Sequence, residues 1–229
     1  MSMRPLAEHS KSLSELARFL GIEESRTISF TGVTSTSLLV QPGDLFLALP
    51  GAKRHGAEFL KEVIASGAVA ILTDSHGATL VDGALPTVIT PTPRAIMGDL
   101  AAWFYGAPSR AMVLVGITGT NGKTTTSSLL HQLWKLADRE DGLMGTNGID
   151  IGGDAIAATF TTPEAPEVQS ILATMVERHV THAVMEVSSH ALQQFRMRST
   201  HFAFAAFTNL TQDHLAFHGD MESYFAANA

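Results

Sequence analysis

The first regular pattern of apolar positions in the chain runs from Ser12 to Gly21. Four apolar residues fall on one face of a helix there: Leu13, Leu16, Ala17 and Leu20. Ser12 is followed three residues later by a glutamate, which is the spacing of a capping box, and Gly21 can end the helix. We therefore predict a short amphipathic helix over this segment.

Shorter apolar runs follow, and turn-forming residues separate them. Residues 45–49 form a buried-strand pattern between Pro-Gly-Asp and Pro-Gly turns, and residues 68–72 and 87–90 predict two further strands. A helical pattern over about residues 57–65 lies between the first two strands. Strands that alternate with helices predict a small N-terminal α/β domain.

A proline-marked stretch, TPTPRA, separates this region from the remainder of the chain. We place the domain boundary near Pro91, so the expected domains are residues 1–91 and residues 92–229. A helix over residues 93–105 is expected to begin the second domain.

The second region again alternates strands and helices. The apolar run 112–117 predicts a strand that leads through a glycine-containing loop into a helix. Residues 162–164, Thr-Pro-Glu, have the form of an N-cap followed by proline at the first helical position, which predicts a helix as far as about Arg178. The apolar runs 182–187 and 202–210 are typical of strands inside a parallel sheet. A doubly wound parallel sheet is the fold that these elements predict.

Composition and charge narrow the class of protein. The 229 residues carry a formal net charge of −7, which disfavours a dedicated nucleic-acid binder, and they include no cysteine, which excludes disulfides and thiolate metal sites. The N-terminus lacks the apolar core of a signal peptide, and no apolar run approaches the roughly 18 residues of a membrane span. We expect a cytoplasmic monomer that binds neither nucleic acid nor membrane.

The sequence VGITGTNGKTTTSSLL predicts a phosphate-binding loop. Its glycines allow backbone N–H groups to converge on phosphate oxygens, and the helix that follows adds the positive end of its dipole. Lys123 would contact the β- and γ-phosphates of ATP, and Thr124 would offer a hydroxyl to Mg²⁺. The loop residues expected to bind the nucleotide are Gly119, Thr120, Asn121, Gly122, Lys123, Thr124 and Thr125. The match to the usual motif is imperfect, because Ile117 occupies the first glycine position.

Polar residues follow each of the later apolar runs, where the sheet of an α/β protein places its ligands. One set is Glu186, Ser188, Ser189 and His190, and the other is Asn209, Asp213, His214 and His218. We interpret Glu186 and His214 as residues of an Mg²⁺ site beside the loop, and His218 as a structural histidine. The loop and these residues do not by themselves choose between a switch, a kinase and a ligase.

Four motifs in order resemble one family. GITGTNGKTTT, TFTTPE, MEVSSHALQQFR and FTNLTQDHLAFHGDMESYF together resemble the central domain of the Mur ligases, and most closely that of the UDP-N-acetylmuramoyl-tripeptide synthetases. The N-terminal GVTSTSLLVQPGDLFLALPGAKRHGAEF is similar to the uridine-nucleotide-binding domain of that family. The resemblance extends from about residue 30 to residue 229, which is far more specific than a phosphate loop alone.

The resemblance implies an ATP-dependent ligase of peptidoglycan synthesis. ATP would phosphorylate the side-chain carboxylate of D-glutamate in UDP-N-acetylmuramoyl-L-alanyl-D-glutamate, and the amine of a diamino acid would then attack the acyl phosphate. The residues implied to be catalytic are Lys123, Glu186 and His214, and the implied metal-site residues are Thr124, Glu186 and His214. The implied contacts to the muramoyl peptide are Thr161, Thr162, Ser188, Gln194 and Arg196, and those to the uridine nucleotide are Ser35 and Ser37.

Three positions depart from the family pattern. The family usually reads Asp-Ser-Arg where this chain has Thr36-Ser37-Leu38, so an arginine and a carboxylate of the uridine pocket are missing. Phe160 replaces an asparagine that often precedes the paired threonines, and Asn228 stands where the family has a lysine that becomes a carbamate. Because of Asn228, and because the rest of the central sheet and a C-terminal domain would lie after residue 229, we expect the chain as given to be inactive in ligation.

Other interpretations stay open. A folylpolyglutamate-type ligase of the same superfamily would share the loop but would need no uridine domain. A non-catalytic nucleotide-binding remnant is a different class, and a phosphate-loop kinase or GTPase is a third, although no base-recognition motif of the N-K-x-D kind is evident. The sequence does not distinguish L-lysine from meso-diaminopimelate as the amino acid added.

Overall fold

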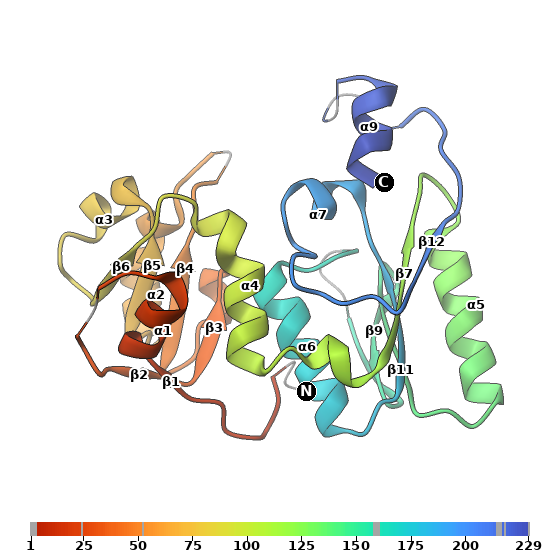
Figure 1. Cartoon of the computed structure of the whole chain (residues 1–229), viewed down its shortest axis with the longest axis horizontal. Coiled ribbons are helices and arrows are strands. Elements are labelled where there is room, and N and C mark those ends of the chain that lie inside the picture. Colours follow the sequence, from red (N-terminus) through yellow and green to blue (C-terminus); the bar gives the residue numbers. More distant parts are fainter. Residues whose placement is uncertain are drawn as a thin grey trace. The chain divides into compact units, whose positions relative to one another are not determined.

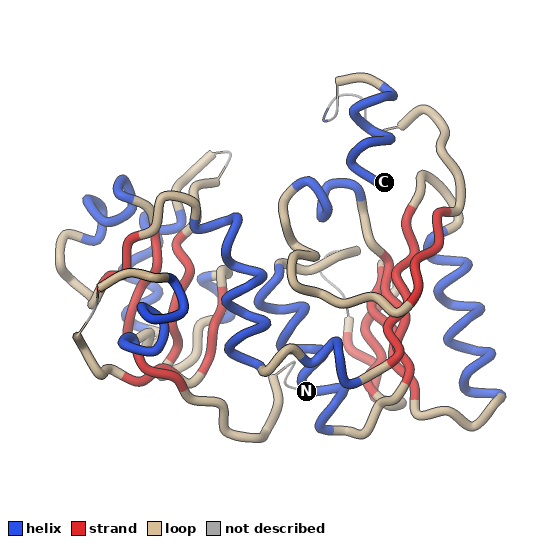
Figure 2. The backbone as a smooth tube through the Cα atoms, in the orientation of Figure 1, coloured by secondary structure: helices blue, strands red, loops and turns tan. Residues whose placement is uncertain are grey.

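The computed structural model describes residues 4–23, 25–51, 53–157, 161–213, 217 and 219–228. The chain forms two compact units: residues 7–104, here the N-terminal unit, and residues 105–229 together with the segment up to Leu6, here the loop-bearing unit. Helices and sheets in both units place the protein in the α/β class (Figures 1 and 2).

The N-terminal unit has a four-stranded parallel sheet in the order β3-β4-β5-β6. Its strands are β3 (Gly32–Thr34), β4 (Asp44–Ala48), β5 (Ala70–Thr73) and β6 (Thr87–Ile89), and a separate antiparallel pair consists of β1 (Lys11–Ser12) and β2 (Ser29–Phe30). The helical segments are α1 (Leu13–Leu20), η1 (Ser37–Leu39), η2 (Gly56–Phe59), α2 (Leu60–Ala65), α3 (Ser75–Val81) and α4 (Pro93–Tyr105). The strands predicted from the three apolar runs are confirmed within one or two residues.

The capping box predicted for α1 is present. The backbone N–H of Glu15 donates to Ser12 Oγ at 3.2 Å, and the backbone N–H of Ser12 donates to Glu15 Oε2 at 2.8 Å. Gly21 ends the helix with a φ of 68°, in the left-handed region that suits glycine. Local sequence was sufficient to define this helix, because both of its ends are capped by residues within it or beside it.

Helix α4 belongs to the N-terminal unit, so the division into compact units falls after Phe104 and later than the boundary expected near Pro91. Phe104 stacks on Phe30 with ring centroids 5.4 Å apart, and Trp103 stacks on Phe19 at 5.0 Å. The prolines after residue 90 therefore precede a helix that buries its apolar face against the first unit.

The loop-bearing unit has a six-stranded sheet in the order β10-β9-β8-β11-β7-β12. The strands are β7 (Val113–Thr118), β8 (Asp141–Gly145), β9 (Gly148–Ile151), β10 (Asp154–Ile156), β11 (His182–Glu186) and β12 (Phe204–Phe207). β7, β11 and β12 are parallel, as predicted, and β8, which was not predicted, pairs parallel to β11, whereas β9 and β10 extend the sheet by antiparallel pairing. The antiparallel extension was not predicted, because its strands are only three and four residues long.

Helices cover both faces of this sheet, which makes it doubly wound (Figure 1). The described helical segments are η3 (Pro108–Ala111), α5 (Lys123–Leu136), α6 (Ala165–Glu177), α7 (Ser189–Gln193) and α9 (Met221–Asn228). Buried residues of α6 pack with Leu114, Met144 and Met185 on one face, whereas α5 packs against Val115, Ile117 and Val184 on the other. None of the helices in the described ranges combines the length and the apolar composition that crossing a bilayer would require.

The apolar run 202–210 contains β12, which pairs with β7 in parallel at one edge of the described sheet. Phe204 is 66% exposed there.

Candidate functional site

The phosphate loop lies between the last residue of β7, Thr118, and the first residue of α5, Lys123. Gly119 has a φ of 124°, and a Cβ added to it would lie 2.3 Å from Thr208 Oγ1 and 2.8 Å from the Asn209 carbonyl oxygen. Gly122 has a φ of 86° and is the N-cap of α5. Both glycines are therefore required by the backbone, the first by contact as well as by conformation.

Asn209, two residues after the end of β12, pairs with the loop through its backbone and its side chain. Its carbonyl accepts from the N–H of Thr120 at 2.9 Å, and its Oδ1 accepts from the N–H of Asn121 at 3.1 Å. Its Nδ2 donates to the Asn121 carbonyl at 2.9 Å. These bonds occupy two loop N–H groups, so the groups best placed for an anion are those at the beginning of α5, where a helix leaves its first N–H groups without intrahelical acceptors.

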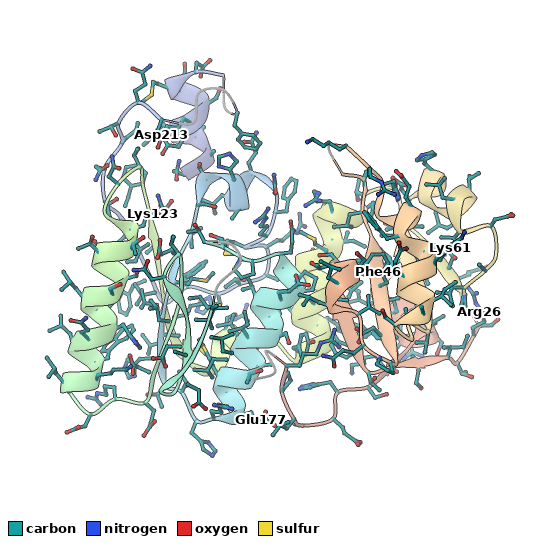
Figure 3. All side chains as sticks on the ribbon, turned by 180° about the vertical axis from the view of Figure 1, so that it is seen from behind. Arg26, Phe46, Lys61, Lys123, Glu177 and Asp213 are labelled. Carbon is teal, nitrogen blue, oxygen red and sulfur yellow. The ribbon has the colours of Figure 1, made fainter. Side chains whose placement is uncertain are left out.

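Lys123 points back over the loop. Its Nζ donates to the carbonyl oxygens of Gly119 at 2.6 Å and Thr120 at 3.0 Å. Burial lowers the pKa of Lys123 below its usual value, although the negative charges of Glu186 and Asp213 oppose that shift. Figure 3 shows Lys123 at the start of α5, at the end of the unit that also carries Asp213. The half-buried ammonium group of Lys123 thus lies against the backbone of the phosphate loop.

Glu186 ends β11, in the centre of the sheet, and is only 2% exposed. Its Oε2 accepts from Thr124 Oγ1 at 2.8 Å and from Thr146 Oγ1 at 3.1 Å, and its Oε1 accepts from the Thr146 N–H at 2.9 Å. A Cβ on Gly145 would lie 2.2 Å from Glu186 Oε1, so that glycine leaves the space which the carboxylate fills. Thr146 was not predicted, although it lies at the carboxyl end of a strand, which is the signal that identified Glu186.

Thr162 has a different role from the predicted N-cap. Helix α6 has Glu164 as its N-cap and proline in its first turn, so it begins two residues later than expected. The hydroxyl of Thr162 instead donates to the Glu186 carbonyl at 3.0 Å and accepts from the Ser188 N–H at 3.2 Å. Sequence alone could not show this, because the partner strand is more than twenty residues away.

Arg196 is held in place by its neighbours. One terminal nitrogen donates to the Thr162 carbonyl at 2.7 Å, and the other donates to Gln194 Oε1 at 2.7 Å and lies 3.2 Å from Glu164 Oε1. Three fixed acceptors orient the planar guanidinium, which suits bidentate binding of a carboxylate or phosphate.

These residues share one cleft of about 540 Å³ in the loop-bearing unit. The cleft is lined by Thr120, Asn121, Gly122, Lys123, Thr124, Thr146, Thr161, Thr162, Glu186, Ser188, His190, Gln194 and Arg196. Every muramoyl-peptide residue named from the resemblance is among them, together with Lys123, Thr124 and Glu186. Thr146 and His190 line the cleft without having been assigned a role.

The other predicted residues lie elsewhere. Gly119 and Thr125 flank the cleft without lining it, and His214 and Phe160 lie outside the described residues. Ser35 and Ser37 belong to the N-terminal unit, where Ser35 Oγ is buried without a hydrogen-bond partner among the described residues.

The donor set of the cleft fits a hard cation. The Glu186 carboxylate and the Thr124 hydroxyl are oxygen donors 2.8 Å apart, and Mg²⁺ prefers oxygen ligands while keeping several waters. In the part of the chain that the structure describes, no three histidine, aspartate or glutamate side chains gather as a metal-binding group.

A doubly wound α/β unit with a phosphate loop at the carboxyl ends of its strands is the class that this fold and cleft define. Residues 117–229 match the Mur ligase middle domain, and residues 28–105 match the catalytic domain of the Mur ligase family. The chain belongs to the Mur ligase family.

Relatives and solved structures agree with this assignment. The chain is 46% identical over 227 residues to the UDP-N-acetylmuramoyl-L-alanyl-D-glutamate--2,6-diaminopimelate ligase of Corynebacterium efficiens, with 95% of this chain and 43% of that protein covered. It is 45% identical over 228 residues to the ligase of that name from Streptomyces coelicolor, with 99% and 45% covered. The chain thus spans less than half the length of these relatives.

Among solved structures, a UDP-N-acetylmuramoyl-L-alanyl-D-glutamate--2,6-diaminopimelate ligase superposes with a TM-score of 0.74 and 27% identity, over 96% of this chain and 44% of that one. The MurF ligase of Thermotoga maritima in complex with ADP superposes with a TM-score of 0.57 and 20% identity, over 86% and 41%. The second match supports the fold alone.

Proposed function

We propose that this chain provides the ATP-binding and UDP-substrate-binding parts of a ligase of peptidoglycan precursor synthesis. The reaction proposed is the ATP-dependent joining of a diamino acid to UDP-N-acetylmuramoyl-L-alanyl-D-glutamate through an acyl phosphate. The observation that carries it is the meeting of Lys123, Glu186 and Arg196 in a single cleft. The names of the relatives favour 2,6-diaminopimelate over lysine as the amino acid.

The proposed mechanism rests on placing two anions side by side. ATP, bound with Mg²⁺, would supply the phosphoryl group that turns a poorly reactive carboxylate into an acyl phosphate. Lys123 and the N–H groups at the beginning of α5 would neutralise the phosphates, while Thr124 and Glu186 would hold the metal ion. Arg196, fixed by its three acceptors, would hold an anionic group of the peptide substrate near them. His214 keeps its proposed place in the metal site.

The N-terminal unit is proposed to bind the uridine nucleotide through Ser35 and Ser37. The buried, unpaired hydroxyl of Ser35 supports this role, since such a group retains an unused donor. Ser35→Ala and Ser37→Ala should each weaken UDP binding in a calorimetric titration while ATP-analogue binding stays unchanged. Wild-type UDP affinity in both variants would contradict the assignment.

The nucleotide proposal is tested by Lys123→Ala. Losing a charged hydrogen bond to phosphate costs about 1.5–3 kcal/mol, so affinity for Mg²⁺ with a non-hydrolysable ATP analogue should fall roughly 10- to 150-fold. Lys135→Ala is the matched control, because Lys135 lies on the same helix but pairs with Asp150 away from the cleft. If calorimetry gave Lys123→Ala and the wild type equal affinity for the analogue, the assignment of residues 119–125 as a phosphate-binding loop would be ruled out.

A further inference from the structure

Helix α9 contacts the phosphate loop and the strand that leads into it, through two residues one turn apart. Tyr224 is only 1% exposed, and its hydroxyl oxygen lies 3.0 Å from Thr120 Oγ1. Asn228 is 8% exposed, and its Oδ1 accepts from Thr118 Oγ1 at 2.7 Å. Residues at positions i and i+4 share one face of a helix, so a single face of α9 meets the end of β7 and the loop together.

The hydrogen-bond directions at Thr120 show how α9 holds the loop. The contacts of Tyr224 with Thr120 and of Asn228 with Thr118 are here called the clamp. Thr120 Oγ1 lies 3.1 Å from the Thr211 carbonyl, which can only accept, so the threonine hydroxyl donates there. The same oxygen accepts from the Thr211 N–H at 2.9 Å, and Tyr224 then donates its own proton to the remaining lone pair. All three bonding positions of the Thr120 hydroxyl are thus used, one of them by α9.

Asn228 completes the attachment. Its Nδ2 donates to the Tyr224 carbonyl at 2.8 Å while its Oδ1 accepts from Thr118, so both ends of the amide are engaged within the unit. The amide therefore connects the last turn of α9 to the final residue of β7. The Asn228 side chain therefore has a structural role, because both of its polar atoms form hydrogen bonds within the unit.

We propose that Tyr224 and Asn228 are positioning residues, which hold Thr118 and Thr120 so that the phosphate loop keeps its nucleotide-binding shape. The expected changes in nucleotide affinity rest on the proposed function. The expected change in loop rigidity does not, because it can be measured without any ligand. Lys123 donates to the Thr120 carbonyl, so movement of Thr120 would also move the lysine. Neither Tyr224 nor Asn228 lines the cleft, so each acts through the loop.

The test compares Tyr224→Phe with Tyr105→Phe, which removes the same hydroxyl from another buried tyrosine that does not line the cleft. Hydrogen exchange of the ligand-free protein should show faster exchange of loop amides 119–122 in Tyr224→Phe and wild-type exchange there in Tyr105→Phe. Affinity for the Mg²⁺–ATP analogue should fall about 3- to 10-fold in Tyr224→Phe, the scale of one neutral hydrogen bond.

A double-mutant cycle distinguishes positioning from general destabilisation. If Tyr224 acts through Thr120, then Thr120→Val combined with Tyr224→Phe should bind the analogue no more weakly than Thr120→Val alone. Additive losses, or wild-type loop exchange in Tyr224→Phe, would overturn the proposal for the tyrosine. Asn228→Ala should likewise speed exchange at residues 117–120, and unchanged exchange would overturn its part.

The outcomes separate this inference from the proposed function. If Lys123→Ala weakens binding but Tyr224→Phe alters neither affinity nor exchange, only the clamp fails. If the protein does not bind the analogue, the nucleotide proposal fails, while exchange of the ligand-free loop still decides the clamp.

Discussion

Replacing Gly145 by alanine should damage the cleft without substituting any residue that lines it. The new Cβ would lie 2.2 Å from Glu186 Oε1 and 2.9 Å from its Cδ, and both distances are far inside van der Waals contact. Gly145 is the last residue of β8, and its φ is outside the left-handed region, so the backbone itself tolerates alanine. The carboxylate must therefore move away from donors that now hold it at 2.8–3.1 Å.

The size of the effect follows from what the displaced carboxylate loses. Overpacking a buried site costs about 1–3 kcal/mol, and one broken charge-assisted hydrogen bond costs about 1.5–3 kcal/mol. These overlap, because moving the carboxylate relieves the clash at the expense of the bonds, so we expect a loss of about 2–3 kcal/mol in unfolding free energy. Affinity for Mg²⁺ with a non-hydrolysable ATP analogue should fall at least about tenfold, since the proposed metal ligand is out of place.

Urea unfolding and calorimetric titration measure the two effects. Gly153→Ala is the control, because Gly153 has a φ of 97° but open space around it, so it should lose stability through backbone strain and keep its nucleotide affinity. In a Glu186→Ala background, Gly145→Ala should cost little, since no carboxylate remains to collide with it. Wild-type affinity in Gly145→Ala, or an equal loss of stability in that background, would refute the reasoning.

Three further predictions follow from single contacts or charges. Gly119→Ala should abolish analogue binding in calorimetry because its Cβ collides with the loop's neighbours, whereas Gly83→Ala, at a positive φ with open surroundings, should not; equal binding of both would be contrary evidence. Burial raises the pKa of Asp150, but hydrogen bonds from Lys135 and from the Gly153 N–H outweigh it, so the pKa is lowered. The contribution of Asp150 to stability is therefore present above the unfolded pKa of about 3.9 and is lost as the pH falls through the lower folded pKa. Asp150→Asn should therefore be less stable than wild type in urea at pH 7, with the gap closing below about pH 4, and a constant gap would contradict the linkage. Phe104→Ala should cost about 3–5 kcal/mol in unfolding the N-terminal unit if α4 belongs to it, while a loss below about 1 kcal/mol would contradict that packing.

Several features could be predicted from sequence because their causes are local. The capping residues of α1 lie within one turn of each other, and the glycines and lysine of the phosphate loop lie within a few positions. Glu186 could be identified because it ends an apolar strand, at the edge where a parallel sheet places its ligands. Parallel pairing of β7 with β11 and β12 followed from alternation of strands with helices.

What only the tertiary structure decided involves partners that are far apart in the chain. Thr162 binds Glu186 rather than capping α6, Thr146 and Tyr224 reach the loop or the carboxylate from distant elements, and α4 joins the unit before it. Hydrogen bonds form between groups that the fold brings within about 3 Å, and sequence spacing carries no such distance once the chain has turned back on itself. The sequence by itself determined the elements whose causes are local, such as helix α1, the phosphate loop and the strands with long apolar runs. The order and crossing of the strands determined which side chains meet.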